Sequence, residues 1–212
     1  MLLKVSIIIP AFNESKNISQ VLEPIQSLRD DYEILVVNDG SEDNTSEVVR
    51  SFDISIIDLT ENRGKSYAMW TGLKHTKGHI VLFLDADLIG LKPVHIENLV
   101  APVVKDMADM TVGIFYSGRN ITDLAQKLMP FLSGQRCVKR EILDKLDSKE
   151  WFSGFGIEVA LTRYAKEHKL RIQEVPLFNV THSLKEEKMG LTKGMKARLK
   201  MYWEITKEIK KV

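Results

Sequence analysis

Several features are scarce in this sequence, and each scarcity excludes a class of protein. The 212 residues contain one cysteine, Cys137, which excludes a disulfide framework or a cysteine-rich zinc site and favours a reducing, cytoplasmic setting. No apolar run approaches the roughly 20 residues that cross a bilayer, and the first residues lack a signal-peptide pattern. The formal net charge is +1, whereas general nucleic-acid binders are distinctly basic. We therefore expect a soluble or at most peripheral protein with no nucleic-acid partner.

Two glycine-rich phosphate motifs are also missing. No Gly-x-Gly-x-x-Gly follows the first apolar run, and no Gly-Lys-Ser/Thr loop occurs, which disfavours dinucleotide binding of the Rossmann type and P-loop NTPases. If phosphates bind here, a metal ion and a cation must hold them. Arg63 and Lys65, at the start of a predicted helix, are candidate cations, with solvated loop charges as the alternative.

Short apolar runs alternate with amphipathic stretches along most of the chain. The apolar runs predict strands at residues 4–10, 33–37, 54–59, 80–84, 109–114 and 171–176. The amphipathic stretches predict helices at residues 15–28, 43–52, 62–75 and 94–105, and another that begins near residue 157. This alternation predicts an α/β fold with a mostly parallel central sheet flanked by helices. Cys137 is interpreted as a small strand residue without chemistry.

The apolar run at residues 80–84 ends in two carboxylates, Asp85 and Asp87. In an open α/β sheet, ligands bind at the carboxyl ends of the strands. Two carboxylates at such an end suit Mg²⁺ or Mn²⁺, which bind through one or two carboxylates plus substrate phosphates; a helix N-cap is the alternative. Polar side chains also follow the first two predicted strands, namely Asn13, Glu14, Asn38 and Asp39. We expect all these loops to form one crevice.

Four motifs, in order, resemble family 2 nucleotide-sugar glycosyltransferases of GT-A fold. They are Val-Ser-Ile-Ile-Ile-Pro-Ala-Phe-Asn-Glu, Val-Val-Asn-Asp-Gly-Ser-x-Asp-Asn-Thr, Asn-Arg-Gly-Lys and Asp-Ala-Asp. The resemblance is close in the first half of the chain and covers the second half in outline. It implies a metal-dependent enzyme that moves a hexose from a UDP- or GDP-sugar to a small phosphorylated or lipid-linked acceptor, with Mn²⁺ or Mg²⁺ as cofactor.

The resemblance also implies roles for single residues. The loop after the first strand would line the nucleoside pocket with Pro10, Phe12 and Glu14. Asp39 would hydrogen-bond a uracil or guanine base. Asp85 would lie by the ribose or the metal, and Asp87 would bind the divalent ion. That ion would neutralise the diphosphate leaving group.

Three further candidates lie in the second half. Ser133-Gly134-Gln135-Arg136 resembles an element of dolichyl-phosphate sugar synthases whose arginine faces the acceptor phosphate, so Arg136 is a candidate acceptor residue, with a surface ion pair as the alternative. Glu158 resembles the family's acceptor-side acid and is a candidate acceptor ligand or general base; its place in a first helical turn is the structural alternative. His182 resembles the histidine that completes the metal site in glucosyl-3-phosphoglycerate synthases. The first group of enzymes inverts and the second retains anomeric configuration, so the stereochemistry is left open.

We divide the chain into a catalytic domain at residues 1–184 and a basic amphipathic helix at residues 185–212. The donor half of the domain is about 1–115 and the acceptor half about 116–184. The tail has nine Lys and Arg against four Glu, and we favour its packing on the catalytic domain or on a second subunit, as in a homodimer, over contact with a membrane surface. Two other functions remain open: a nucleotidyltransferase, which normally has a Gly-rich loop after the first strand, and a non-catalytic sugar-nucleotide-binding protein.

Overall fold

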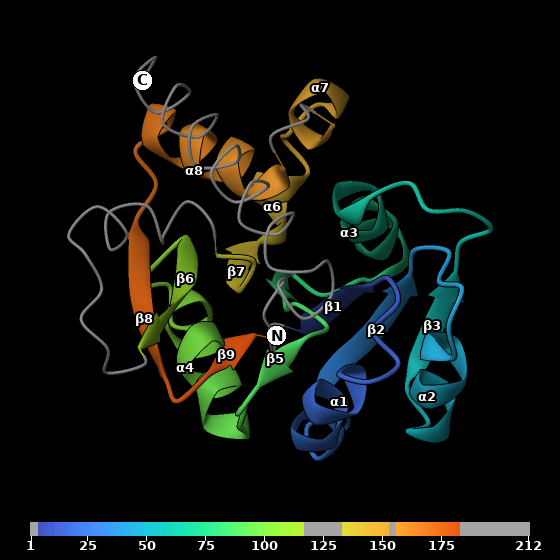
Figure 1. Cartoon of the computed structure of the whole chain (residues 1–212). Coiled ribbons are helices and arrows are strands. Elements are labelled where there is room, and N and C mark those ends of the chain that lie inside the picture. Colours follow the sequence, from blue (N-terminus) through green and yellow to red (C-terminus); the bar gives the residue numbers. More distant parts are fainter. Residues whose placement is uncertain (1–3, 117–132, 153–155, 183–212) are drawn as a thin grey trace, which may run out of the picture.

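Figure 1 shows a computed structural model of the chain, in which the structure describes residues 4–116, 133–152 and 156–182. The strands of this described part are β1 (Val5–Ala11), β2 (Tyr32–Asn38), β3 (Ser55–Asp58), β4 (Ile80–Phe83), β5 (Leu88–Ile89), β6 (Met110–Tyr116), β7 (Arg136–Lys139), β8 (Ile172–Phe178) and β9 (Thr181–His182). Seven of them form a central sheet in the order β3-β2-β1-β4-β7-β6-β8, and β5 pairs with β9. Each neighbouring pair in the central sheet is parallel except the two pairs that contain β7.

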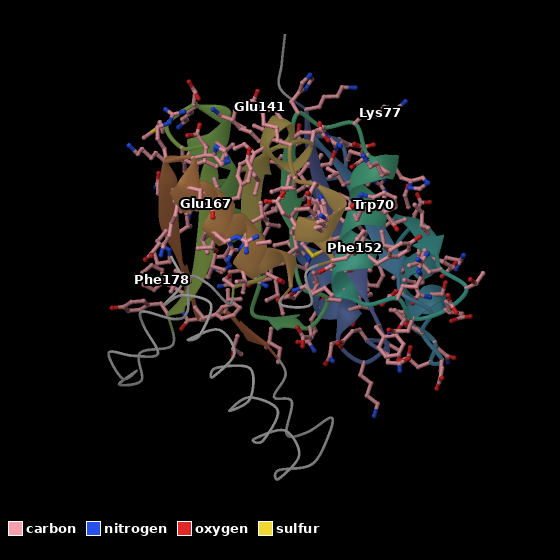
Figure 2. All side chains as sticks on the ribbon, turned by 90° about the horizontal axis from the view of Figure 1, so that it is seen from above. Trp70, Lys77, Glu141, Phe152, Glu167 and Phe178 are labelled. Atoms are coloured by element: carbon pink, nitrogen blue, oxygen red, sulfur yellow. The ribbon has the colours of Figure 1, made fainter. Side chains whose placement is uncertain are left out.

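Helices cover both faces of the sheet. The described helices are α1 (Ile18–Gln26), α2 (Thr45–Ser51), α3 (Lys65–His75), α4 (Pro93–Val104), α6 (Arg140–Leu143), α7 (Ser148–Trp151) and α8 (Ile157–Glu167). In Figure 1, α1, α2 and α4 lie on one face, and α3, α6, α7 and α8 lie on the other. Figure 2 looks down on the second face, where Trp70 of α3 and Phe152, directly after α7, pack edge to face with ring centroids 6.1 Å apart.

Each face of the sheet supports its own apolar core. In β1, Ile7 and Ile9 belong to the core beneath α1 and α4, whereas Ile8 belongs to the core beneath α3 and α8. A strand buried on both faces reads as a continuous apolar run rather than as an alternating pattern. The backbone of α3 approaches β1 closely at Gly72, because a Cβ added there would lie 2.4 Å from Ile8 Cγ2. This contact fixes α3, and with it the start of the helix, over the centre of the sheet.

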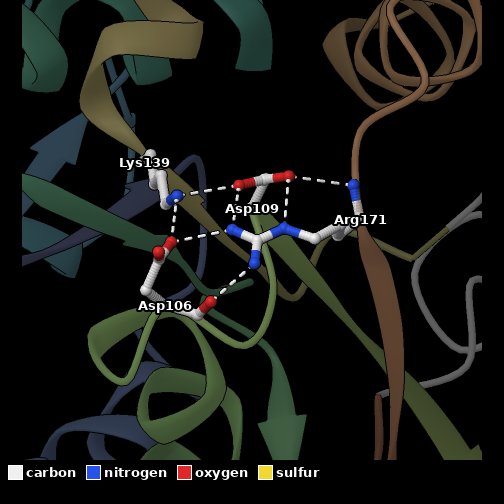
Figure 3. Close-up of polar contacts among 4 residues, drawn as sticks. All are labelled: Asp106, Asp109, Lys139 and Arg171. Carbon is white, nitrogen blue, oxygen red and sulfur yellow. Dashed lines mark hydrogen bonds and ion pairs between the residues drawn. The ribbon is translucent and has the colours of Figure 1, made fainter.

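An ion-pair network ties the other half of the sheet together at the edge opposite the carboxyl ends of the parallel strands (Figure 3). Lys139 at the end of β7 contacts Asp106 at 2.6 Å and Asp109 at 2.7 Å. Arg171, just before β8, contacts the same two carboxylates at 2.7 and 2.8 Å. Hydrogen bonds from Arg171 and Lys139 hold the pKa of Asp109 well below its usual range, although partial burial opposes the shift. The network therefore joins the starts of β6 and β8 to the end of β7.

The predicted α/β fold with a mostly parallel sheet is confirmed. The strands and helices named from the sequence occur within three residues of their predicted ends. Cys137 is a buried residue of β7, as expected. The sequence did not predict the antiparallel direction of β7, the β5–β9 pair or the short helices α6 and α7. The predicted C-terminal helix at residues 185–212 lies outside the described residues, so its packing and the proposed domain division stay predictions.

Within residues 4–116, 133–152 and 156–182, no helix has both the length and the apolar composition needed to cross a bilayer.

Candidate active site

Two of the polar loops at the carboxyl edge are bound to each other. The Asp39 N–H donates to Ala11 O at 2.8 Å, and the Asn13 N–H donates to Ser41 Oγ at 2.9 Å. Further along, the Glu14 N–H donates to Thr45 Oγ1 at 2.8 Å. These bonds hold the loop after β1 against the loop after β2. The predicted nucleoside residues Pro10, Phe12 and Glu14 therefore lie beside Asp39, and Phe12 is 41% exposed.

Asp39 shapes the turn that leads into α3. Its side chain is nearly buried at 2% exposure, and its Oδ1 and Oδ2 accept hydrogen bonds from the backbone N–H groups of Arg63 and Gly64 at 2.9 and 2.8 Å. Gly64 has a φ of 90°, which a residue without a side chain adopts at little cost. The Arg63 guanidinium lies over the Tyr67 ring, 3.6 Å from its centroid. Asp39 thus helps to position Lys65, the first residue of α3. The predicted contact of Asp39 with the base stays a prediction.

Lys65 joins the two halves of the site. Its Nζ lies 2.6 Å from Asp85 Oδ1, in the turn after β4, and 2.6 Å from Glu158 Oε1, in the first turn of α8. Burial lowers the pKa of Lys65, but the charges of the two carboxylates raise it by more, so the net shift is upward. Lys65, Asp85 and Glu158 therefore form one ion-pair cluster, in which the cation lies between a carboxylate of the predicted donor half and one of the predicted acceptor half.

The second oxygen of Asp85 is also held. Gln135 Nε2 donates to Asp85 Oδ2 at 2.7 Å. The backbone of Gly134 lies so close that an added Cβ would be 2.5 and 2.6 Å from the two carboxylate oxygens. Any side chain at this position would force the Asp85 carboxylate to shift. Neither Gly134 nor Gln135 was assigned a role from the sequence, and the only signal was their place in the motif quoted for Arg136.

Asp87 and His182 approach one another through the small second sheet. Asp87 is partly buried in the turn between β4 and β5, and the next residue, Leu88, pairs across the ladder with His182 of β9. In the described part of the chain, no group of three or more His, Cys, Asp or Glu side chains is gathered as a ready metal site. Two carboxylates with few other protein ligands fit a Mg²⁺ or Mn²⁺ ion that completes its coordination with phosphate oxygens and water. Asp85 and Asp87 therefore fit the predicted metal, and His182 as a ligand stays a prediction.

Arg136 lies behind Glu158 in the protein interior. It is 0% exposed; its Nε donates to Ser133 O at 2.9 Å and its Nη1 to Thr162 Oγ1 at 2.8 Å. Thr162 in turn donates to the backbone oxygen of Glu158 at 2.8 Å. Burial lowers the pKa of Arg136 to about 10, although the negative charge of Glu158 acts to raise it. The alternative of a surface ion pair for Arg136 is wrong because the side chain is buried, and its contact with an acceptor stays a prediction.

Comparison with known proteins shows which family the chain is similar to. The family model described as glycosyl transferase family 2 matches residues 6–197. Glucosyl-3-phosphoglycerate synthase of Mycobacterium tuberculosis is 28% identical over 195 residues, covering 74% of this chain and 59% of that protein. The 4,4'-diaponeurosporenoate glycosyltransferase of Staphylococcus aureus is 35% identical over 100 residues, covering 45% of this chain and 27% of that protein. The chain thus spans less than two thirds of the length of these curated relatives.

Solved structures of the M. tuberculosis synthase are also similar to this chain. The M. tuberculosis synthase in complex with Mn²⁺, UDP and glucosyl-3-phosphoglycerate superposes with a TM-score of 0.72 and 26% identity, covering 85% of this chain and 72% of that chain. The complex of the same synthase with Mg²⁺ and UDP superposes with a TM-score of 0.73 and 25% identity, and again covers 85% of this chain and 72% of that chain. These likenesses confirm the predicted GT-A fold. Since the family model matches nearly the whole sequence, the chain belongs to glycosyl transferase family 2.

Proposed function

We propose that this chain is a metal-dependent glycosyltransferase that moves a hexose from a UDP- or GDP-sugar to a small phosphorylated or lipid-linked acceptor. The observation that carries the proposal is the position of Lys65, whose Nζ lies 2.6 Å from both Asp85 and Glu158. If the donor binds at Asp85 and the acceptor at Glu158, this cation would lie where the leaving group meets the acceptor. UDP and a phosphorylated acceptor are the first to test, because the M. tuberculosis structures hold UDP and phosphoglyceric acid.

On the donor side, the chain's own groups would bind and orient the nucleotide. Asp87 and Asp85, with His182, would hold the divalent ion, which supplies positive charge against the diphosphate as it leaves. The ammonium of Lys65 would add a second positive charge at that place. The loop with Pro10, Phe12 and Glu14 would cover the nucleoside, next to the buried carboxylate of Asp39.

On the acceptor side, Glu158 is the group that faces Lys65 from α8. With a hydroxyl acceptor, Glu158 can take the proton from the attacking oxygen; an ionised phosphate acceptor needs no such base. Arg136 lies behind Glu158 and contributes a buried positive charge on the acceptor half. The stereochemical course stays open, because both a retaining and an inverting reaction can use this set of groups.

The experiment that tests this function measures thermal unfolding with UDP and with GDP, each with and without Mn²⁺. A ligand at 100 times its dissociation constant stabilises the folded state by about 2.7 kcal/mol, which for a chain of this size is about 5–11 °C. The shift should require Mn²⁺ and should be lost in Asp87→Ala, while Asp30→Ala, at an exposed turn before β2, should keep it.

The same preparations are then assayed for UDP release from UDP-glucose with phosphoglyceric acid as acceptor. Release that depends on the acceptor supports the transferase. A metal-dependent shift without release by any acceptor of either class would support the binding-protein alternative instead. No shift with either nucleotide in folded protein would refute the proposed function.

A further inference from the structure

Two contacts of the Asp85 carboxylate differ in kind. On one side, the Lys65 ammonium lies 2.6 Å from Oδ1, and the Lys65 side chain is 41% exposed at the start of α3. On the other side, the Gln135 amide donates to Oδ2 at 2.7 Å, and Gln135 is 0% exposed. One contact comes from a charged, partly exposed side chain and the other from a neutral group in the interior.

The fold determines where the Gln135 amide points. The backbone oxygen of Gln135 accepts from the Gly113 N–H of β6 at 2.8 Å, and Ser133 Oγ lies 3.0 Å from Gln135 Oε1. A carboxylate oxygen can only accept, so the amide nitrogen, not the amide oxygen, must face Asp85. The missing side chain at Gly134 leaves the space that the carboxylate occupies.

The two contacts respond differently to a divalent cation. A lysine ammonium and a metal ion carry the same sign of charge and compete for one carboxylate, so cation binding at Asp85 weakens the Lys65 contact. The Gln135 amide carries no net charge and does not compete. The Gln135 contact can therefore persist when a metal ion binds. Groups that orient a metal-binding side chain in this way typically change metal affinity 10- to 100-fold when they are removed.

We propose that Gln135 is a positioning residue for the metal ion: its buried amide holds Asp85 in one orientation while Lys65 is displaced. The proposal rests on the proposed function, since it requires a divalent ion at Asp85. It assigns Gln135 no contact with the sugar or the acceptor. The predicted effect of losing the amide is thus on metal affinity, and not on nucleotide recognition.

The test is a titration of Mn²⁺ into the full chain with UDP present, following the electron paramagnetic resonance signal of free Mn²⁺. Gln135→Met keeps the length of the side chain and removes the donor, and we expect its apparent dissociation constant for Mn²⁺ to rise about 10- to 100-fold. Gln173→Met, at an exposed position of β8, is the matched control and should bind as the wild type does. In an Asp85→Ala background, Gln135→Met should add no further loss.

The outcomes separate this proposal from the function on which it depends. Absence of Mn²⁺ binding in the wild type overturns both. Wild-type affinity in a folded Gln135→Met protein overturns the positioning role alone, and so does an equal loss in the Asp85→Ala background, which would indicate a general structural effect. If Gln135→Met does not fold, Gln135→Asn is used, because it keeps an interior amide that is one methylene too short to reach Asp85. Unchanged Mn²⁺ affinity in that variant also overturns the proposal.

Discussion

Replacing Lys65 with methionine should move the affinities for metal and nucleotide in opposite directions. Lys65 Nζ lies 2.6 Å from Asp85 Oδ1, and an ion such as Mg²⁺ lies about 2.1 Å from a carboxylate oxygen. A metal on that oxygen would therefore be within about 5 Å of the ammonium. In a medium with the dielectric constant of water, the repulsion between charges of +2 and +1 at that distance is about 1.7 kcal/mol. Mn²⁺ without nucleotide should then bind Lys65→Met about 10- to 20-fold more tightly than the wild type.

The same substitution should weaken the binding of UDP. If Lys65 contacts the diphosphate, its loss removes charge-assisted hydrogen bonds that contribute about 1.5–3 kcal/mol, which is about 10- to 150-fold in affinity. Stability should fall only by about 1 kcal/mol, because the lysine is 41% exposed and solvent screens its ion pairs. The unfolding temperature should drop by about 2–4 °C.

The assay is a pair of titrations by calorimetry, Mn²⁺ alone and UDP at fixed Mn²⁺, on Lys65→Met and on Lys74→Met. Lys74 is an exposed lysine near the other end of α3, so its replacement controls for the loss of one positive charge from the same helix. Unchanged or weaker Mn²⁺ binding in Lys65→Met would refute the competition between ammonium and metal. Unchanged UDP binding would refute the assignment of Lys65 to the diphosphate.

Three other predictions concern single positions. Because hydrogen bonds from Arg171 depress the pKa of Asp109, this carboxylate adds stability that is complete above about pH 4 and is lost as the pH falls through the depressed pKa; Asp109→Asn should lower the unfolding temperature most at pH 7 and somewhat less at pH 3, and a drop that does not shrink with falling pH would contradict the depressed pKa. Gly134→Ala places a methyl group against the Asp85 oxygens and should cost about 1–3 kcal/mol in thermal unfolding together with weaker Mn²⁺ binding; wild-type values for both would contradict the tight contact between Gly134 and the carboxylate. Burial raises the pKa of the Cys137 thiol, so an aromatic disulfide reagent should label it only after unfolding, and rapid labelling of the folded protein would contradict its burial.

The sequence predicted the first half of the fold because that half follows simple periodicity. All seven residues of β1 are buried, so the strand appears as an unbroken apolar run between polar segments. The helices between the strands carry one apolar face, as α1 does with Ile18, Val21, Leu22 and Ile25. Here local pattern and tertiary burial agree, and no knowledge of distant contacts is needed.

The strand β7 shows where this reasoning fails. Two of its four residues, Arg136 and Lys139, are charged, so the local pattern does not indicate a buried strand. Arg136 is accommodated by Thr162 of α8, and Lys139 by the carboxylates of Asp106 and Asp109. Those partners are distant in the sequence, and nothing in β7 itself signals them. The strands β5 and β9 were missed for another reason: each has two residues, which are too few to establish a period in the sequence.

The candidate residues and a shared crevice for three loops were predicted from the sequence, but the ion-pair cluster was not. Lys65, Asp85 and Glu158 were each candidates from the sequence, and the bridge between them was not predicted because it depends on where the fold places the first turn of α8 relative to the start of α3. Gln135 was not a candidate at all. A neutral amide has no distinctive pattern in a sequence, and its significance arises only from its burial and its contact with Asp85.

The antiparallel direction of β7 explains why one short segment serves both halves of the site. In the β4–β7 ladder Phe83 pairs with Arg136 and Ile80 with Lys139, so β7 begins where β4 ends. Its first residue and the preceding Gln135 therefore lie at the carboxyl edge beside Asp85, whereas a parallel strand would have carried them to the opposite edge. Side chains alternate between the faces of a sheet, so a shift of one residue in this ladder would exchange the faces of all β7 side chains. The ion pairs of Lys139 at the far end of β7 (Figure 3) favour the observed register, and the same register is the one in which the Gln135 amide reaches Asp85.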